Sequence, residues 1–425
     1  MDNKEMATLR ALMEFEATRK APPEGFPKLP DIPAGRYTDP RFYELEQEHL
    51  WRKSWLFAAH MDEVPEPGCF LLWENAGQPI IIVHSKSGDI NAFYNTCSHR
   101  GAPIVTQKSG KKSRLTCAYH GWSYTHDGEL IGIRDPEDFN GLDMSCRGLK
   151  KVRCERFGNL IWVNFDPDAP TLKEWLGPIA DEWQDFQFDS CRLIGRHIFD
   201  LNCNWKVAME ANTEVYHVRS IHAKTVAPTL DDRRNVNTFY RNGHGRMIAP
   251  ARKGMENAQR DSAPPGIVPI ETVSEIGRTC IQSYGVFPNW VSPLSDYFLP
   301  PLQFWPNGID KCRFEVWTLV ADWGDGPRPD MVNFWTNEDG SELNDVLLED
   351  TQFGEAIQKS MQSYGFEGVP LSYQEARIYN WNQFADQIIG IDDIPEELRV
   401  AQVIGEEWLY PNDPRVAQLN NISAG

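Results

Sequence analysis

Two short segments of the sequence hold matched pairs of cysteine and histidine. Cys97 and His99 form the first pair, and Cys117 and His120 form the second pair further along the chain. Two thiolates and two imidazoles are the ligands of a [2Fe–2S] cluster in which histidine replaces cysteine on one of the irons. Thiolates are soft ligands that hold such clusters, and the imidazoles raise the reduction potential. The four residues therefore predict a Rieske-type centre that carries one electron at a time.

A glycine follows the histidine of each pair closely. Gly101 and Gly121 suit tight loops, because glycine adopts backbone conformations that other residues avoid. Trp122 comes next, and we expect it to cover the cluster and limit its exposure to water. The alternative is a structural zinc site, since two cysteines and two histidines also form a tetrahedral set. Zinc modules more often group cysteine with cysteine and histidine with histidine, so the mixed pairs favour the iron–sulfur cluster.

A second group of possible metal ligands lies in residues 204–222. His217 and His222, with Glu214 close by, offer the two imidazoles and one carboxylate that bind Fe(II) and leave positions open for oxygen. The two histidines are five residues apart, which corresponds to about 140° around an ideal helix. Both therefore cannot face one metal from a regular helix. We expect the helix to end or bulge between them, at Arg219–Ser220.

The cysteine–histidine pairs lie in the sequences CSHRG and CAYHGW, which resemble those of the large (α) subunits of Rieske non-haem iron oxygenases, the ring-hydroxylating oxygenase family. The resemblance extends to the second group, where the family pattern of two acids and two histidines falls on Glu210, Glu214, His217 and His222. It implies that the two histidines bind a mononuclear Fe(2+). It also implies a third ligand in a downstream helical Glu-Asp segment, which nominates Asp350. Weaker candidates for that ligand are Asp345, Glu349, Asp392 and Asp393.

The acid that precedes the first histidine differs from the usual family residue. In the family that the sequence resembles, this acid is most often aspartate. There it bridges an iron-binding histidine to a Rieske histidine of the neighbouring subunit. Here Glu214 keeps the carboxylate and adds one methylene, so that the bridge is chemically possible with a different reach. Glutamate also occurs in relatives that act on quaternary ammonium compounds. The residue therefore keeps that substrate class open.

The resemblance implies a terminal oxygenase that uses O2 and electrons from NAD(P)H to hydroxylate or cis-dihydroxylate an aromatic or related apolar substrate. The sequence has no Gly-x-Gly-x-x-Gly signature after a strand, so we expect a separate reductase, a ferredoxin or both to supply the electrons. A homotrimer is implied if each cluster serves the iron of a neighbour, with or without a small β subunit. The alternatives are a Rieske monooxygenase for quaternary ammonium compounds, a Rieske electron carrier without oxygenase activity, and a zinc-stabilised binding protein.

The segments that must position these residues indicate two domains of the α+β class. A chain of 425 residues exceeds one ordinary hydrophobic core. Short apolar strands with glycine turns predict an all-β Rieske domain over residues 56–168, followed by a catalytic iron domain over 169–425. Residues 1–55 hold helices and a proline-rich arm that we expect to pack on the catalytic domain. By resemblance, that domain is helix-grip-like, with an antiparallel sheet and flanking helices.

Periodicity gives more detailed expectations for single elements. Helical patterns cover residues 4–19, 39–55, 171–186, 205–222, 343–363 and 372–389. Strand patterns after the Rieske domain cover residues 192–201, 279–287, 312–322 and 330–335. Residues 224–275 are rich in Arg, Asn, Gly and Pro, which predicts long loops.

The charge and the cysteines bear on partners and location. A formal net charge of −19 disfavours binding to nucleic acid or to an anionic membrane. Nine cysteines and an N-terminus without an apolar signal-peptide core predict reduced thiols in the cytoplasm. The segment between the two cysteine–histidine pairs is instead basic, and it either docks an acidic redox partner or is a solvated hairpin tip. Its cationic residues are Arg100, Lys108, Lys111, Lys112 and Arg114.

Overall fold

The computed structural model describes residues 1–261, 263–416 and 419. The chain divides into two compact units. One unit is Trp51–Glu174, and the other consists of Met1–Leu50 together with the chain from Trp175 onward. The first fifty residues thus belong to the same unit as the C-terminal half of the chain. The domain borders expected at residues 55–56 and 168–169 stay a prediction.

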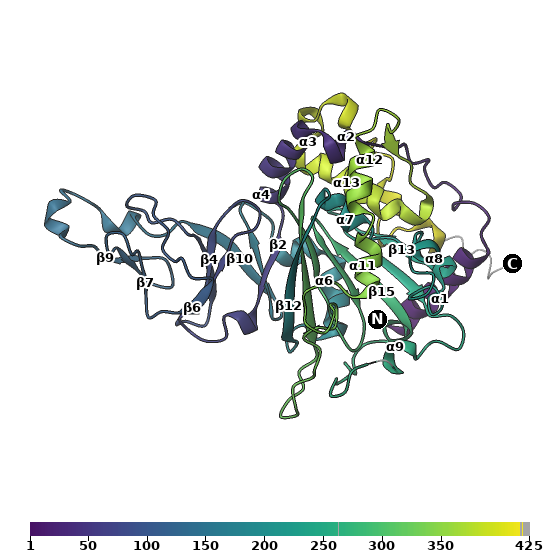
Figure 1. Ribbon diagram of the computed structural model, residues 1–425, viewed down its shortest axis with the longest axis horizontal. Coiled ribbons are helices and arrows are strands. Elements are labelled where there is room, and N and C mark those ends of the chain that lie inside the picture. Colours follow the sequence, from purple (N-terminus) through teal and green to yellow (C-terminus); the bar gives the residue numbers. More distant parts are fainter. Residues whose placement is uncertain (262, 417–418, 420–425) are drawn as a thin grey trace. The chain divides into compact units, whose positions relative to one another are not determined.

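The unit Trp51–Glu174 is built mainly from antiparallel strands (Figure 1). Its larger sheet has the strand order β2 (Leu56–His60), β11 (Leu160–Asn164), β10 (Lys151–Phe157), β5 (Ile90–Tyr94), β4 (Ile80–His84), β3 (Cys69–Trp73) and β6 (Ser109–Lys111). A smaller sheet has the order β7 (Leu115–Thr116), β8 (Ser123–Tyr124) and β9 (Leu130–Gly132). Side chains from both sheets share one core, in which Phe93 and Leu115 are fully buried. This core supports the loops that carry the cysteine–histidine pairs.

The second unit is organised around one antiparallel sheet of seven strands (Figure 1). Its strand order is β12 (Arg192–Leu201), β18 (Cys312–Val320), β17 (Leu302–Pro306), β16 (Trp290–Leu294), β15 (Cys280–Val286), β14 (Gly245–Pro250) and β13 (Val236–Phe239). A two-stranded ladder of β1 (Ile32–Pro33) and β19 (Gly368–Val369) joins the N-terminal arm to the C-terminal part.

The helices are mostly short. In chain order they are α1 (Asn3–Thr18), α2 (Gly35–Thr38), α3 (Pro40–Leu45), a π-helical turn Glu46–Leu50, α4 (Trp51–Lys53), α5 (Leu172–Leu176), α6 (Pro178–Glu182), α7 (Trp205–Glu210), α8 (Val218–Ile221), α9 (Ala258–Asp261), α10 (Glu275–Thr279), α11 (Asp345–Thr351), α12 (Gly354–Met361) and α13 (Ala376–Ile389). In the described part of the chain, no helix is long and apolar enough to cross a lipid bilayer.

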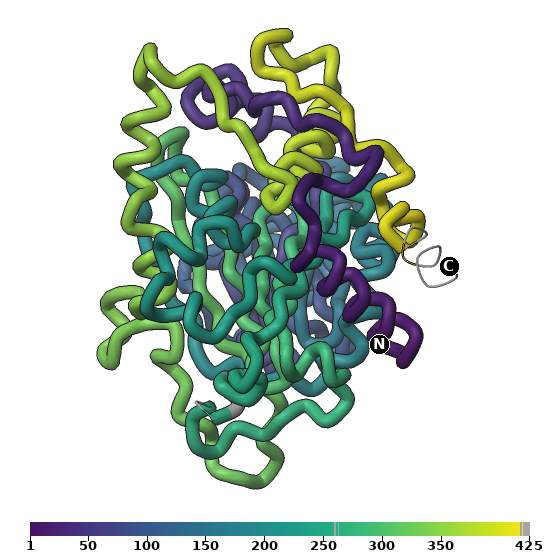
Figure 2. Tube along the Cα trace, turned by 90° about the vertical axis from the view of Figure 1, so that its right-hand side faces the viewer, coloured from purple at the N-terminus to yellow at the C-terminus, as the bar shows by residue number. Residues whose placement is uncertain are grey.

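Helices cover both faces of the seven-stranded sheet. Side chains alternate along a strand, so that Ile248 of β14 faces one side and Met247 faces the other. On the first side Ile248 packs with Leu9 and Leu12 of α1, which Figure 2 shows at the N-terminal end of the trace. On the other side Met247 packs with Val215 and Val218, and Arg377 of α13 donates a hydrogen bond to the carbonyl of Gly245 in β14. The Met247 side, called the inner face below, carries the candidate iron site.

Several expected elements are confirmed. The helices at 4–19 and 372–389 are α1 and α13, and the strands at 192–201, 279–287 and 312–322 are β12, β15 and β18. The strand expected at 330–335 is wrong, because these residues form turns. Its apolar pattern has another cause: Met331 and Phe334 anchor the loop in a cluster with Val320.

The loops expected over residues 224–275 are also wrong in part, because they contain β13 and β14. The polar residues that interrupt the apolar pattern of these two strands are buried and paired. Arg246 of β14 binds Glu182 at 2.8 Å, and Asn237 of β13 donates to the carbonyl of Gln374 at 2.8 Å. Buried polar pairs of this kind break the alternation of apolar and polar residues by which a strand is recognised.

Candidate metal centres

The two cysteine–histidine pairs lie on loops of the same geometry. Cys97 follows β5 and Cys117 follows β7. In each loop the glycine four residues later donates its N–H to the cysteine carbonyl, at 2.9 Å for Gly101 and 3.0 Å for Gly121. Both glycines have positive φ, 73° and 77°, where any residue with a Cβ would be strained. The repeated loop geometry explains why each pair is followed by glycine.

The four side chains of these pairs lie close together. Nδ1 of His99 and Nδ1 of His120 are 3.0 Å apart, and both thiols are buried. The Trp122 ring stacks on His99 with 4.8 Å between ring centroids, as expected for a residue that covers the centre. Burial raises the pKa of the Cys97 thiol, while a contact with the Tyr124 hydroxyl at 3.2 Å favours the thiolate.

The two histidines of the second group flank a single helical turn. Helix α7 ends at Glu210, His217 lies directly before α8, and His222 lies directly after it. The break expected at Arg219–Ser220 is therefore wrong in position. The non-helical backbone lies instead between Glu210 and His217, and the centroids of the two imidazole rings are 5.0 Å apart.

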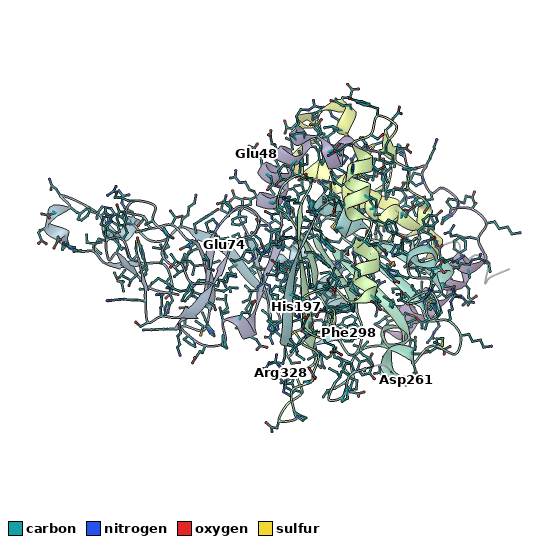
Figure 3. The ribbon with its side chains drawn as sticks, in the orientation of Figure 1. Glu48, Glu74, His197, Asp261, Phe298 and Arg328 are labelled. Atoms are coloured by element: carbon teal, nitrogen blue, oxygen red, sulfur yellow. The ribbon has the colours of Figure 1, made fainter. Side chains whose placement is uncertain are left out.

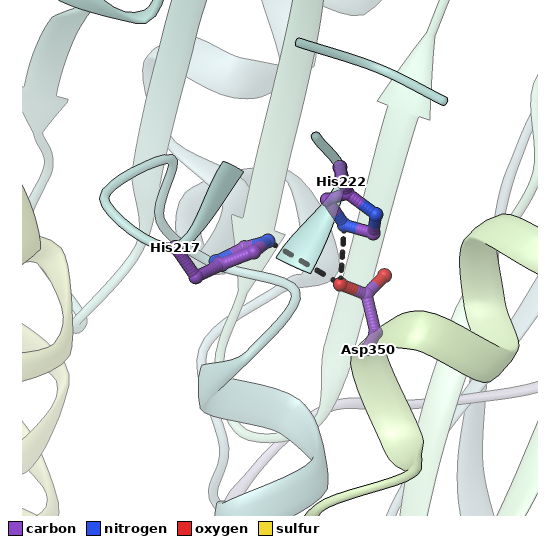
Figure 4. Close-up of side chains that lie close together, drawn as sticks. All are labelled: His217, His222 and Asp350. Carbon is purple, nitrogen blue, oxygen red and sulfur yellow. Dashed lines mark hydrogen bonds and ion pairs between the residues drawn. The ribbon is translucent and has the colours of Figure 1, made fainter. Parts of the chain in front are cut away.

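Helix α11 brings the third predicted ligand to these histidines (Figure 4). Oδ1 of Asp350 lies 2.7 Å from Nε2 of His222 and 3.3 Å from Nε2 of His217. The three donor atoms all lie within 4.8 Å of one another. The structure thus brings together the three residues nominated from the sequence, and the two imidazoles present the same nitrogen to one carboxylate oxygen.

Two further carboxylates hold the other ring nitrogens. Oε1 of Glu214 lies 2.5 Å from Nδ1 of His217, and Oε2 of Glu349 lies 2.7 Å from Nδ1 of His222. Thr225 donates its hydroxyl to the same Glu349 oxygen at 2.5 Å. Partners of this kind fix the tautomer and the ring orientation of metal-binding histidines. The sequence presented Glu349 only as a weaker candidate ligand, because its place next to Asp350 does not reveal that it supports His222.

The electrostatics of this site favour a positive charge. Burial lowers the pKa of His217, but hydrogen bonds to Asp350 and Glu214 outweigh burial and raise it to about 10. Burial likewise opposes protonation of His222, and the contact with Asp350 raises its pKa. The carboxylates therefore provide a field in which a cation replaces protons at the imidazoles.

Glu210, the first acid of the family pattern, does not reach the histidines through any described hydrogen bond. Both of its carboxylate oxygens accept from the Tyr37 hydroxyl, at 2.9 Å. Burial raises the pKa of Glu210 to about 7, although the Tyr37 hydrogen bond opposes the shift. It therefore ties the end of α7 to α2.

A cavity of about 240 Å³ opens beside the three candidate ligands on the inner face of the sheet. Most of its lining is aliphatic, with Phe298 (labelled in Figure 3) and Trp335 as aromatic members. Asn212 and Val218 also line it, whereas Met209 of α7 lines a separate small cavity.

Two family models match the chain. The model of the Rieske [2Fe-2S] domain matches residues 54–148, and the model of the ring hydroxylating alpha subunit (catalytic domain) matches residues 188–391. The chain belongs to the family of Rieske ring-hydroxylating alpha subunits. The resemblance seen in the sequence is confirmed, and so is the fold class, an all-β Rieske domain and an α+β catalytic domain with an antiparallel sheet.

The chain spans about half the length of the curated relatives it matches. The glycine betaine monooxygenase oxygenase subunit of Chromohalobacter salexigens is 33% identical over 202 residues, which cover 47% of this chain and 45% of that protein. The toluate 1,2-dioxygenase subunit alpha of Pseudomonas putida is 33% identical over 195 residues, which cover 44% of this chain and 43% of that protein.

Two solved structures show the same fold over most of the chain. A quaternary ammonium Rieske monooxygenase has a TM-score of 0.69 at 21% identity, and the match covers 87% of this chain and 99% of that one. Naphthalene 1,2-dioxygenase from Rhodococcus sp. has a TM-score of 0.68 at 21% identity, with 91% and 98% covered.

The donor atoms fit the two groups that the family implies, a [2Fe–2S] cluster and a mononuclear iron. In the Rieske domain, the two Nδ1 atoms lie 3.0 Å apart, and the two buried thiols of the same loops interact with each other. In the catalytic domain, two Nε2 atoms and one carboxylate oxygen converge, and the cavity adjoins them. That second set is the two-histidine, one-carboxylate set that leaves open positions on iron.

Proposed function

We propose that this chain is the oxygenase component of a multi-protein Rieske enzyme, which inserts oxygen from O2 into an organic substrate. One observation carries the proposal. His217, His222 and Asp350 converge at an apolar cavity, in a chain that also presents the ligand set of an electron-carrying cluster. An electron carrier without oxygenase activity needs neither the three converging ligands nor the cavity.

Each metal group has a defined set of residues in this proposal. Cys97, His99, Cys117 and His120 hold the [2Fe–2S] cluster, while His217, His222 and Asp350 hold Fe(2+). Bound there, the cluster would supply single electrons and the iron would supply the reductive activation of O2.

The surrounding residues orient and protect these ligands. Glu214 and Glu349 hold the protons of the two imidazoles at Nδ1, so that both Nε2 lone pairs face the Asp350 side. The apolar walls of the cavity keep water from the substrate. Glu214 is also the acid proposed to bridge to the Rieske histidine of a neighbouring subunit.

The favoured substrate class is aromatic or related apolar compounds, which are hydroxylated or cis-dihydroxylated. The aliphatic and aromatic lining of the cavity supports this class, as does the similarity to a toluate 1,2-dioxygenase. A second candidate is the oxidation of a quaternary ammonium compound. The glutamate at position 214 and the similarity to a glycine betaine monooxygenase favour it.

The proposal includes partner proteins. A separate reductase, a ferredoxin or both pass electrons from NAD(P)H, and the exposed basic segment that contains Lys111 and Lys112 is proposed to dock one of them. The oxygenase is proposed to be a homotrimer, with or without a β subunit, in the cytoplasm.

Oxygen consumption tests the proposal directly. The iron-loaded protein is mixed with NAD(P)H, a Rieske reductase and a panel of aromatic, apolar and quaternary ammonium compounds, and products are analysed. We expect O2 uptake coupled to a hydroxylated product for at least one compound. A reducible cluster without mononuclear iron or product would instead identify an electron carrier, and a colourless zinc protein would refute the Rieske assignment.

A further inference from the structure

One wall of the cavity next to His217 is formed by the inner face of the sheet. Ser283 of β15 pairs in register with Met247 of β14 and with Pro293 of β16, and all three line the cavity. Directly opposed residues of antiparallel strands point to the same face of a sheet. Met247 also packs against Val215 and Val218, beside the candidate ligands. The Ser283 side chain therefore points toward the space that a substrate would occupy.

The Ser283 hydroxyl is unpaired there. The residue is 3% exposed, and its Oγ has no hydrogen-bond partner among the residues that the structure describes. A buried hydroxyl without a partner is unfavourable. Two other polar side chains of the wall are paired: Asn212 donates to the Ala208 carbonyl at 3.0 Å, and Ser295 donates to the Phe298 carbonyl at 3.4 Å. Nε1 of Trp335 also lacks a partner among the described residues, but an indole N–H can only donate, whereas a hydroxyl both donates and accepts. Ser283 is thus available to hydrogen-bond with a ligand.

The charges of the wall exclude one class of ligand. Among the described residues that line the cavity there is no lysine or arginine, and the acidic ones are Glu214 and Asp350. A carboxylate that left water for this cavity would lose its hydration without gaining a cationic side chain. It would also find no net positive charge at the iron site, because the Glu214 and Asp350 carboxylates balance the two charges of Fe(2+).

The aromatic residues argue against a quaternary ammonium ligand. Among the described lining residues the aromatic side chains are Phe298 and Trp335, apart from the two histidines. Their rings pack edge to face with 5.7 Å between centroids, so they form a single wall. Capture of a quaternary ammonium uses a cage of aromatic faces around the cation. A single wall does not provide that cage.

We infer that the cavity selects a neutral, largely apolar ring compound that carries one hydroxyl or carbonyl oxygen, and that Ser283 Oγ hydrogen-bonds this oxygen. The inference deepens the proposed function, because it rests on that function for the fate of the bound compound. The selection itself is a property of binding, and it can be measured without turnover.

Four probes that share a phenyl ring test the selection: toluene, benzyl alcohol, benzoate and benzyltrimethylammonium. Calorimetry on the iron-loaded protein gives the dissociation constant of each. We expect benzyl alcohol to bind about three- to tenfold tighter than toluene, because it satisfies the buried hydroxyl. Benzoate should bind more weakly than toluene because no cationic side chain lines the cavity, and benzyltrimethylammonium should do so because no aromatic cage surrounds it.

Substitutions at Ser283 assign the preference to its hydroxyl. Ser283→Ala should weaken the binding of benzyl alcohol about three- to tenfold and leave toluene unchanged. Ser283→Thr keeps a hydroxyl and should keep the preference. Thr318→Val is the matched control: Thr318 lies on β18 of the same sheet, and its hydroxyl is also buried without a partner among the described residues, but it does not line the cavity. It should change neither affinity.

Three results would overturn the inference. These are benzoate binding as tightly as benzyl alcohol, an equal loss of toluene and benzyl alcohol binding in Ser283→Ala, and no binding of any probe to the wild-type protein. Should Ser283→Ala fail to fold, two measurements decide: the order of the four probe affinities in the wild-type protein, and the affinities of Ser283→Thr for benzyl alcohol and toluene. The expected selectivity without any oxygenated product would uphold the inference and refute the proposed oxygenase function.

Discussion

At the scale of single residues, the catalytic unit places a carboxylate behind each candidate iron-binding histidine. Glu214 holds Nδ1 of His217, and Glu349 holds Nδ1 of His222. With both Nδ1 atoms held, each ring has one nitrogen left for a metal. The two supporting acids come from different parts of the chain, so the orientation of each imidazole depends on a separate element.

Removal of Glu349 should weaken iron binding and leave the cluster intact. In Glu349→Ala the His222 ring loses its support and Thr225 loses its acceptor, so we expect iron affinity to fall about 10- to 100-fold. Iron retained during dialysis against a chelator measures the effect. Asp345→Ala, an exposed acid on the same helix, is the control. Equal retention of iron in Glu349→Ala and wild type would show that Glu349 has no supporting role.

Glu210 should make the stability of the catalytic unit depend on pH. Burial raises its pKa from 4.5 to about 7, so the folded protein holds a proton that the unfolded chain releases between these values. The resulting stabilisation is complete below pH 4.5 and is lost as the pH rises through 7, a change of about 3 kcal/mol. Glu210→Gln keeps an acceptor for Tyr37 and removes the titration.

Urea unfolding of the iron-loaded wild type and Glu210→Gln measures this dependence. The free energy of unfolding of the wild type, minus that of the variant, should fall by about 3 kcal/mol between pH 4 and pH 8. Parallel pH curves for the two proteins would contradict the assignment of a buried, proton-holding carboxyl group.

At the scale of elements, buried ion pairs tie the N-terminal helices to the elements that carry the site. Arg36 of α2 binds Asp386 of α13 at 2.6 Å, and both side chains are fully buried. Lys206 of α7 binds Glu46 at 2.7 Å, also fully buried. The first pair holds α2 against α13, and the second holds the start of α7 against the π-helical turn Glu46–Leu50.

Replacing one partner of the Arg36–Asp386 pair should lower the stability of the protein. Arg36→Met leaves the Asp386 carboxylate buried without its cation, and we expect a loss of about 3–5 kcal/mol in the free energy of unfolding. Chemical denaturation measures it. Arg36→Met combined with Asp386→Asn should recover about half of the loss, because no buried charge remains unpaired and the acceptor for the Val400 N–H is kept. A double variant no more stable than Arg36→Met would contradict this explanation.

The elements also show what sequence alone can predict. Cys97, His99, Cys117 and His120 lie on two local loops, so their spacing already describes their geometry. His217 and Asp350 meet only through tertiary packing of α11 on the turn around α8, and their pairing came from the family resemblance. The strands β13 and β14 were missed because buried polar pairs such as Arg246–Glu182 interrupt their pattern.

At the scale of the whole molecule, a net charge of −19 contrasts with the basic segment between the cluster loops. Lys111 and Lys112 lie at the end of β6, at the edge of the larger sheet of the Rieske unit. Lys111 pairs with Glu66 at 2.8 Å, and both side chains remain more than half exposed. Such exposed charges contribute little to stability and are available for steering a partner.

Reversal of both lysines should slow electron delivery. Lys111→Glu/Lys112→Glu is expected to lower the rate of cluster reduction by an acidic ferredoxin or reductase about tenfold at low ionic strength, and to weaken its salt dependence. Stopped-flow absorbance of the cluster measures the rate. Lys4→Glu/Lys253→Glu, a double reversal in the other unit, is the control. Equal rates in both double variants would place the docking site elsewhere.

The central claim is that electrons held by the cluster at Cys97, His99, Cys117 and His120 are used at His217, His222 and Asp350. A single-turnover experiment tests it. Protein with a chemically reduced cluster, freed of reductant, is mixed with O2 and a substrate, and cluster absorbance and product are followed together. In the wild type, cluster reoxidation should accompany product formation. In Asp350→Ala, the reduced cluster should show an unchanged spectrum and yield no product. Product from that variant at the wild-type level would contradict the claim.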